Sequence, residues 1–412
     1  MTAFSEILQT QPQQSAGSGD VIHEALNAIR THLGMEIGYF SEFVGDRSVF
    51  RRVDAPGLEH LIKVGDSQAL DDVYCTHIIE GRLPQLIPDT ALEPFTTAMP
   101  ITHAVPIGSH VSIPIRLPDG RPFGMFCCLS PRPNPTLNER DLETMRVFAG
   151  LATKQVHAGV EQRRSLSEKR SSIDHVIGQA RYEMVFQPIV DLASMRTTSV
   201  EALCRVRSDP YRSPDKWFRD AAEVGLGVEF ELGAIAAAVA CFGDLPVPIG
   251  MSVNASPETI LSGRLAEVLD ERYLDRTTIE VTEHAPISDY AAIHRALAPL
   301  RSRGVRIAID DAGAGYSGLQ QIIQIAADTI KLDMSLTRGI NDDGARRALA
   351  SAMIYYARET GSSIVAEGIE TAEELSTLRL LGVGRGQGYL LGKPSRLSAM
   401  DFGEAAQAHA VA

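Results

Sequence analysis

The stretch Ile307-Ala308-Ile309-Asp310-Asp311 joins a short apolar run to two adjacent carboxylates. Apolar runs of this length, rich in β-branched residues, are typical of strands that are buried on both faces of a parallel sheet. The same pattern, an apolar strand-like run with a polar residue at or just after its end, recurs along the second half of the chain. The polar residues of this set are Glu201, Asn254, Glu280, Asp310, Asp311, Lys331, Glu367 and Gln387.

Amphipathic segments separate these runs and predict helices. One such segment carries Ile293, Leu297 and Leu300 at helical spacing. Another begins with Thr371 and Glu374, the two residues of a capping box. About 220 residues of alternating strand and helix predict an α/β fold with a closed, TIM-like (β/α)8 barrel. Strand ends carry the chemistry of such barrels, so we expect the polar set to meet at one rim.

Carboxylates that converge on a partly dry rim repel one another unless positive charge lies among them. Mg²⁺ and Mn²⁺ prefer carboxylate and water oxygens as ligands, and the absence of thiolate and histidine from the set disfavours zinc. Adjacent carboxylates such as Asp310 and Asp311 could flank two ions. Paired ions activate water and steady a leaving oxygen in phosphoester hydrolysis, so the sequence predicts phosphodiester chemistry.

Composition narrows the possible classes of protein. The chain has 412 residues, enough for two domains, and a formal net charge of -13, which argues against a partner that is a nucleic-acid polymer. Its five cysteines show no metal-binding spacing, and their odd number argues against a disulfide framework. A chain without disulfides is typical of a reducing compartment, so we expect a cytoplasmic protein. No signal-peptide pattern and no run of about 18 apolar residues is present, so we expect no membrane insertion.

The first half of the chain has a different pattern, with strands and short helices that predict an α+β domain. It includes a hairpin with strands at 112–117 and 123–129. A helix begins after Asn138, with Asp141 at its third position, and becomes highly charged further on. This connecting helix either pairs with its copy in a homodimer or is a solvated linker packed on its own domain. The expected segments are a disordered tail at 1–20, a sensor domain at 21–158, the overlapping connecting helix at 138–178, the barrel at 180–400 and a C-terminal tail at 401–412.

Taken in order, the motifs of the second half resemble the EAL-domain phosphodiesterases of bacterial cyclic diguanylate signalling. The matching segments are Glu201-Ala202-Leu203-Cys204-Arg205, Val253-Asn254, Glu280-Val281-Thr282-Glu283, Asp310-Asp311, Lys331-Leu332-Asp333, Ala366-Glu367-Gly368-Ile369-Glu370 and Gln387-Gly388-Tyr389. The resemblance covers residues 180–400. Each motif alone is weak evidence, whereas the ordered set is specific.

The resemblance implies a role for each matching residue. One Mg²⁺ or Mn²⁺ ion would be held by Glu201, Asn254, Glu280 and Asp310, and a second by Asp310, Asp311 and Glu367. Lys331 would orient the attacking water or stabilise charge on the phosphoryl oxygens, and Glu367 is either a metal ligand or the general base. Cyclic diguanylate would be contacted by Gln187, Leu203, Arg205 and Gln387, and Glu283 would anchor the loop that follows it.

One loop departs from the family pattern. The family usually reads Asp-Asp-Phe-Gly-Thr-Gly-Tyr-Ser-Ser, whereas residues 310–318 place Ala312, Ala314 and Gly318 at the Phe, Thr and final Ser positions. All proposed metal ligands remain, so the sequence predicts metal-dependent hydrolysis of cyclic diguanylate to linear pGpG. The alternatives are a catalytically inactive cyclic diguanylate receptor and a protein-interaction scaffold.

The N-terminal region resembles a GAF sensor domain, on the segment Asp72-Val73-Tyr74-Cys75-Thr76-His77 and the hairpin that ends at Ser130. Such domains bind nucleotides, haem, bilins or nothing, so the ligand stays open. Cys75 could attach a chromophore, but a buried structural thiol is the favoured interpretation. The resemblance implies a sensor that regulates the barrel.

Overall fold

The computed structural model describes residues 20–281, 287, 289–312 and 318–402. Glu283 and residues 313–317 of the altered loop therefore lie outside the described residues. The chain divides into two compact units, residues 1–165 and 166–412. In the described part, no helix has both the length and the apolar character needed to cross a membrane.

The first unit is built on one antiparallel sheet with strand order β3-β2-β1-β6-β5-β4. Its strands are β1 (Ile37–Val44), β2 (Arg47–Asp54), β3 (Ser67–Ala69), β4 (Leu86–Ile87), β5 (Ser109–Arg116) and β6 (Pro122–Ser130). Its helices are α1 (Val21–His32), α2 (Tyr74–Ile79), α3 (Pro94–Thr97), α4 (Pro100–Ala104) and the first part of α5 (Glu139–Gly178). The predicted hairpin corresponds to β5 and β6, which pair Ile113 with Phe126.

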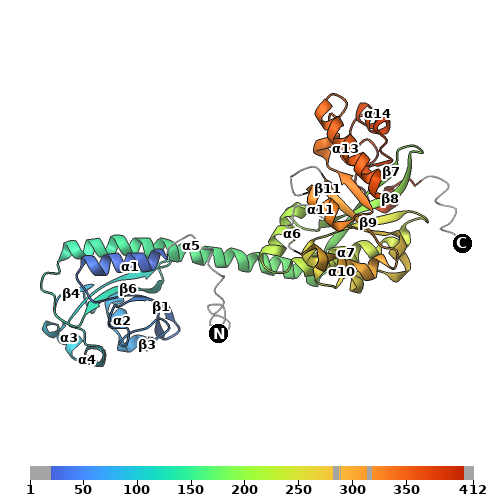
Figure 1. Cartoon of the computed structure of the whole chain (residues 1–412). Helices are drawn as coiled ribbons and strands as arrows, with labels where there is room; N and C mark the ends of the chain where they lie inside the picture. Colours follow the sequence, from blue (N-terminus) through green and yellow to red (C-terminus); the bar gives the residue numbers. More distant parts are fainter. Residues whose placement is uncertain (1–19, 282–286, 288, 313–317, 403–412) are drawn as a thin grey trace. The chain divides into compact units, whose positions relative to one another are not determined.

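Successive side chains along each strand point to opposite faces of this sheet, and both faces are apolar. On β6, Phe126 and Cys128 belong to a core with α1 and α5, which lie side by side in Figure 1. The intervening residues Met125 and Cys127 belong to a second core with α2 on the other face. Period-two side-chain direction thus lets one strand serve both layers of this α+β unit.

Helix α5 begins with the predicted cap. The Asn138 side chain accepts a hydrogen bond from the backbone N–H of Arg140 at 2.9 Å, and Asp141 accepts one from the N–H of Asn138 at 3.0 Å. These reciprocal bonds satisfy backbone donors that have no partner inside the helix. The helix then continues for 40 residues.

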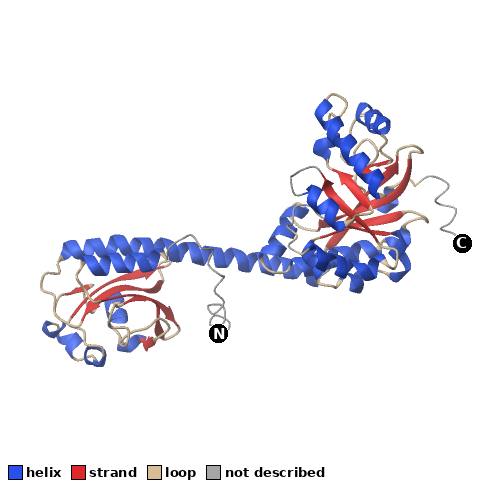
Figure 2. Ribbon diagram, in the orientation of Figure 1, coloured by secondary structure: helices blue, strands red, loops and turns tan. Residues whose placement is uncertain are grey.

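The second unit is a closed barrel with strand order β10-β11-β12-β13-β14-β7-β8-β9, drawn in red inside its helices in Figure 2. The strands are β7 (Tyr182–Asp191), β8 (Arg196–Val206), β9 (Gly250–Ala255), β10 (Thr277–Val281), β11 (Arg306–Ala312), β12 (Thr329–Leu332), β13 (Ser363–Ala366) and β14 (Arg385–Gly386). The α-helices are α6 (Pro214–Glu223), α7 (Gly227–Ala240), α8 (Pro257–Leu261), α9 (Leu265–Val268), α10 (Tyr290–Arg301), α11 (Gly318–Ile325), α12 (Met334–Thr337), α13 (Gly344–Thr360) and α14 (Ala372–Leu381).

The predicted TIM-like barrel is confirmed, with one strand in a different direction. β7 pairs antiparallel with both β8 and β14, whereas the other described neighbours pair in parallel. The reason is the short connection between β7 and β8, which lets the chain form a hairpin but leaves no room for a crossover helix. Asp191 holds this turn by accepting hydrogen bonds from the Ser194 N–H and hydroxyl, both at 2.7 Å.

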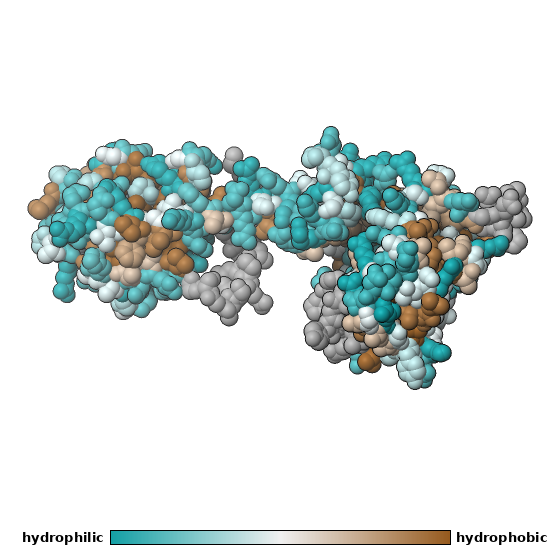
Figure 3. All heavy atoms as spheres, turned by 90° about the horizontal axis from the view of Figure 1, so that it is seen from above, coloured by the Kyte–Doolittle hydropathy of each residue, from teal (hydrophilic) through white to brown (hydrophobic). Residues whose placement is uncertain are grey.

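The outer faces of the barrel strands build the main core. Ile279, Ile309 and Ile330 are fully buried against the surrounding helices. Figure 3 shows hydrophilic residues over much of the surface of each unit, with hydrophobic residues in separate patches. The inward-facing positions, in contrast, hold the predicted polar set.

Candidate active site

The strand period explains the spacing within the segment Glu201-Ala202-Leu203-Cys204-Arg205. Ala202 and Cys204 are buried in apolar cores, so they point away from the barrel interior. Glu201, Leu203 and Arg205 therefore share the opposite face of β8. Glu201 is buried, whereas Leu203 and Arg205 are half-buried. The inward face of β8 thus carries the buried carboxylate of Glu201, followed by the more accessible side chains of Leu203 and Arg205.

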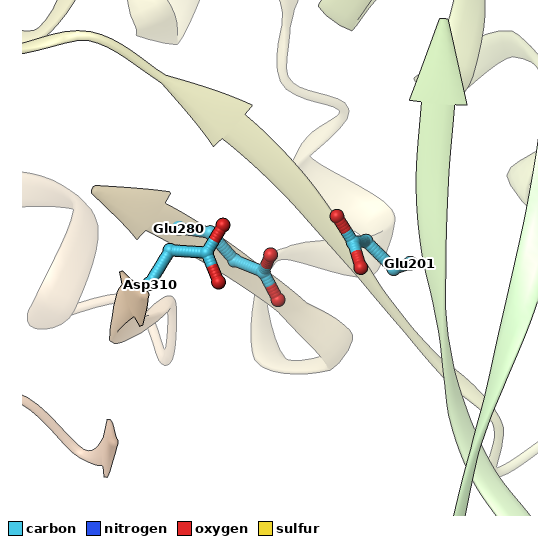
Figure 4. A group of neighbouring side chains, drawn as sticks. All are labelled: Glu201, Glu280 and Asp310. Carbon is cyan, nitrogen blue, oxygen red and sulfur yellow. The ribbon is translucent and has the colours of Figure 1, made fainter. Parts of the chain in front are cut away.

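Strand register brings the other ligand candidates to the same place. Glu280 lies beside Asn254 of β9 and Ala308 of β11 in the parallel pairing. The Asn254 side-chain amide donates a hydrogen bond to Glu201 at 3.1 Å. Glu201, Glu280 and Asp310, which come from three different strands, are drawn in Figure 4. Each of the three offers an oxygen within 4.8 Å of the others.

Lys331 lies at the centre of the carboxylates and is 1% exposed. Its Nζ is 2.7 Å from Glu280, 2.7 Å from Glu367, 2.9 Å from Asp310 and 3.3 Å from Glu201. An ammonium group has three N–H donors, so four carboxylates exceed what it can satisfy. Among the described residues, buried Asp310 Oδ1 accepts no hydrogen bond despite its short distance to the ammonium.

Burial and charge set the protonation of this cluster. Burial raises the pKa of Glu280 to about 8, with Lys331 opposing the rise and Glu201 adding to it. Burial also raises the pKa of Glu367 well above its usual range. For Glu201, burial acts in the same direction, but Lys331 and the hydrogen bonds from Gln387 and Asn254 outweigh it and lower the pKa.

The pKa of Lys331 is raised well above its usual value. Burial alone would lower it, but the four surrounding carboxylates have the larger combined effect. The ammonium therefore stays charged, and Glu280 and Glu367 take up protons readily. The cluster has an excess of negative charge that one lysine does not balance.

A local irregularity brings Asp311 to the site. Successive side chains of a regular strand point to opposite faces. Here the pairing of β11 with β12 shifts between Ile309 and Ala312, and Asp311 has a φ of 55°. A bulge of this kind redirects a side chain. As a result, Asp310, Asp311 and Glu367 offer oxygens within 4.8 Å of one another.

The donor set fits hard dications. In the described part of the chain, every candidate ligand atom is an oxygen, Asp310 belongs to both carboxylate groups, and one of its oxygens is buried without a hydrogen bond. Mg²⁺ and Mn²⁺ are bound by such ligands, and a carboxylate shared between two groups is suited to bridging two ions.

Gln187 and Gln387 lie next to this cluster and contact the protein. The Gln387 amide donates to Glu201 at 2.6 Å and to Gln187 at 3.0 Å, and the Gln187 amide donates to the Gly392 carbonyl at 3.1 Å. Both side chains are buried. The Gln387 amide nitrogen therefore positions Glu201, and Gln187 holds Gln387, roles that the sequence did not predict. Gln387 Oε1 has no hydrogen-bond partner among the described residues.

Gly368 also positions the site and was missed by sequence reasoning. Its φ is 67°, and a Cβ at this residue would lie 2.5 Å from the Cβ of Met334. Glycine is thus required here on two grounds, backbone conformation and close packing. Because Gly368 follows Glu367 directly, it fixes how that carboxylate leaves the strand. The dipeptide Glu-Gly after an apolar run was the available signal.

Comparison with known proteins supports these features. An EAL domain model matches residues 170–394, and a GAF domain model matches residues 15–154. A cyclic di-GMP phosphodiesterase of Pseudomonas aeruginosa is 31% identical over 237 residues, which cover 54% of this chain and 40% of that protein. A second one from the same species, RocR, is 31% identical over 45% of this chain and 46% of its own length.

A solved structure of an EAL enzyme with bound cAMP and cyclic di-GMP covers 88% of this chain and 92% of its own, with a TM-score of 0.55 and 20% identity. That likeness concerns the fold alone. The chain spans less than half the length of the curated relatives it matches. Since the first of the two domain models covers more than half of the sequence, the chain belongs to the EAL-domain family, with a GAF domain before its barrel.

Proposed function

We propose that this chain hydrolyses cyclic diguanylate to linear pGpG with Mg²⁺ or Mn²⁺, under the control of its GAF domain. The observation that carries the proposal is the oxygen-rich cluster around Lys331, in which four carboxylates face one ammonium and Asp310 belongs to two potential ligand groups. The names of the relatives supply the substrate.

The metal ligands follow from the two carboxylate groups. Glu201, Glu280 and Asp310 would hold one ion with the side-chain oxygen of Asn254, and Asp310, Asp311 and Glu367 would hold the other. When bound, such ions lower the pKa of water and stabilise charge on phosphate oxygens. Lys331 keeps the carboxylates in place and offers a positive charge toward the phosphoryl group.

Glu367 has the properties of a proton acceptor. It is close to Lys331, and burial raises its pKa, which makes its carboxylate a stronger base. In this role, a Glu367 oxygen would take the proton of the attacking water. If Glu367 is a metal ligand instead, it needs a side-chain oxygen for the ion but does not need to accept a proton.

The accessible side chains on β8 are suited to the substrate. Arg205 is half-buried on the same face as Glu201, and its guanidinium can donate two parallel hydrogen bonds to a phosphate. Leu203 lies between them and offers apolar contact to a base. Gln387 supports Glu201 by a direct hydrogen bond, and Gln187 accepts a hydrogen bond from the Gln387 amide. A cytoplasmic location and a homodimer complete the proposal.

The test is turnover of cyclic diguanylate by the purified full chain, with Mg²⁺ or Mn²⁺, followed by chromatography of the products. We expect linear pGpG. Glu201→Gln should reduce turnover by at least about 100-fold because it weakens a metal ligand. The matched control Glu373→Gln changes an exposed residue of α14 and should keep full activity. Intact substrate after long incubation with both metals would defeat the proposal.

A further inference from the structure

A cavity of about 510 Å³ lies at the opposite end of the barrel from the carboxylates. Thr278, Arg306 and Thr329 line it, and they stand at or next to the first residues of their strands. Further along these same strands, on the same inward face, stand Glu280, Asp310 and Lys331. The barrel interior therefore has two polar ends, one acidic and one lined by hydroxyls and guanidinium groups.

The second end concentrates positive charge in a chain whose net charge is -13. Arg196, Arg306 and Arg385 all line the cavity, with one carboxylate, that of Asp191. Arg196 and Arg306 make no ion pair within the described residues. One carboxylate oxygen of Asp191 already accepts hydrogen bonds from Ser194. The lining thus has a charge excess of about +2.

Arg385 is the deepest of the three arginines. Its guanidinium donates to the hydroxyls of Thr329 and Ser363. Burial lowers the pKa of Arg385, and the nearby positive charge of Arg306 lowers it further, while Asp191 opposes this effect. Two guanidinium groups that line one cavity without a full counter-charge form a site in which an anion relieves repulsion.

The size of the cavity and the chemistry of its lining limit the ligand. A volume of about 510 Å³ is within the range of small-molecule sites. Guanidinium groups bind phosphate through paired hydrogen bonds, and the threonine hydroxyls add neutral donors. Phe402 and Ile249 supply apolar contact at the same cavity. We infer that this end of the barrel binds a small phosphate-bearing anion of nucleotide size or less, at a site separate from the carboxylates.

The test is calorimetric titration of the full chain with inorganic pyrophosphate, in metal-free buffer at low salt. Without dications the carboxylate end repels the probe, so the result is independent of phosphodiesterase activity. We expect one pyrophosphate per chain. Arg306→Gln should weaken binding at least tenfold, and Arg196→Gln should weaken it similarly, because each removes a phosphate donor. Thermal unfolding checks that both variants fold.

The control Arg140→Gln removes the same charge from an exposed position in the other compact unit and should leave the affinity unchanged. Glu201→Gln should also leave it unchanged. Absence of binding by the wild-type chain, or equal affinity in Arg306→Gln, would overturn the inference. Tighter binding in Glu201→Gln would place the anion among the carboxylates, and tighter binding of citrate than of pyrophosphate would refute the phosphate class.

Discussion

Lys331 holds together a cluster that would otherwise be unstable. A buried ammonium next to four carboxylates stabilises charges that burial disfavours, and breaking such a cluster leaves uncompensated charge. Its substitution therefore affects the free energy of unfolding as well as catalysis. A bound dication can replace part of the stabilisation that Lys331 provides, because the ion binds the same carboxylate oxygens.

For Lys331→Met we expect a loss of about 3 to 5 kcal/mol in unfolding free energy without metal. Mn²⁺ should restore more stability to this variant than it adds to the wild type. Thermal unfolding with and without Mn²⁺ measures both effects. Lys393→Met, which alters an exposed lysine over the ring of Tyr389, is the control. Wild-type stability of the metal-free variant would show that the cluster needs no cation.

Glu367→Gln separates the two possible roles of Glu367. The amide keeps an oxygen for a metal but accepts no proton, so a general base predicts a fall in kcat of about 10²- to 10⁴-fold with Mn²⁺ affinity largely kept. The pH profile of kcat should also lose its acidic limb. Parallel loss of Mn²⁺ affinity and activity would assign Glu367 as a ligand instead.

His110 gives the first compact unit a pH-dependent stability. It is 1% exposed, and burial lowers its pKa from 6.5 to about 4. Between these two pKa values, His110 binds a proton more readily in the unfolded chain than in the folded one. The contribution of neutral His110 to the free energy of unfolding is therefore complete above about pH 6.5 and declines as the pH falls toward 4. The total is roughly 3 kcal/mol.

We expect His110→Gln to reduce this acid sensitivity. Urea unfolding at pH 7 and pH 5 measures it. The single tryptophan, Trp217, reports the barrel unit by fluorescence, so the transition seen by circular dichroism alone belongs to the first compact unit. Equal sensitivity of variant and wild type would show that His110 is not responsible.

At the level of elements, the site depends on how the strands end. The bulge at Asp310 and Asp311 and the tight passage at Gly368 each aim a carboxylate that a regular strand would direct elsewhere. Both features involve positive φ, which is costly for residues other than glycine. The barrel helices supply the packing that maintains these conformations.

Gly368→Ala tests this dependence. The substitution adds a Cβ 2.5 Å from Met334 in a left-handed conformation, so we expect a loss of at least about 2 kcal/mol and reduced turnover. Gly361→Ala is the matched control, because its φ is 73° but nothing lies within 4 Å of the added Cβ. It should cost about 1 kcal/mol and keep turnover. Equal losses of stability and turnover in both variants would show that the contact with Met334 does not matter.

The sequence predicts those elements whose determinants are local. The apolar runs, the cap at Asn138 and the capping box at Thr371 and Glu374 were all visible as spacing, and the structure confirms them. The pairing of β7 with β14 and the amide bonds of Gln387 depend on segments that are remote in sequence. No local pattern encodes them. The bulge after Ile309 was hidden for the same reason, although two adjacent carboxylates hinted at it.

At the level of the whole molecule, α5 is the segment that continues from the first compact unit into the second. A continuous helix transmits rotation or displacement more directly than a flexible linker does. We therefore expect the fragment 139–412, which keeps α5, to turn over cyclic diguanylate at a rate that differs from that of the full chain. Chromatography of products and light scattering measure rate and oligomeric state. Unchanged values of both would make α5 a passive tether.

The central claim is that oxygens from separate strands hold two dications beside Lys331. Anomalous diffraction from crystals grown with Mn²⁺ and cyclic diguanylate tests it most directly. We predict two manganese peaks, both beside Asp310, with Glu201 and Glu280 at one and Asp311 at the other. Manganese bound elsewhere, or absent from these carboxylates while the nucleotide is present, would contradict the account.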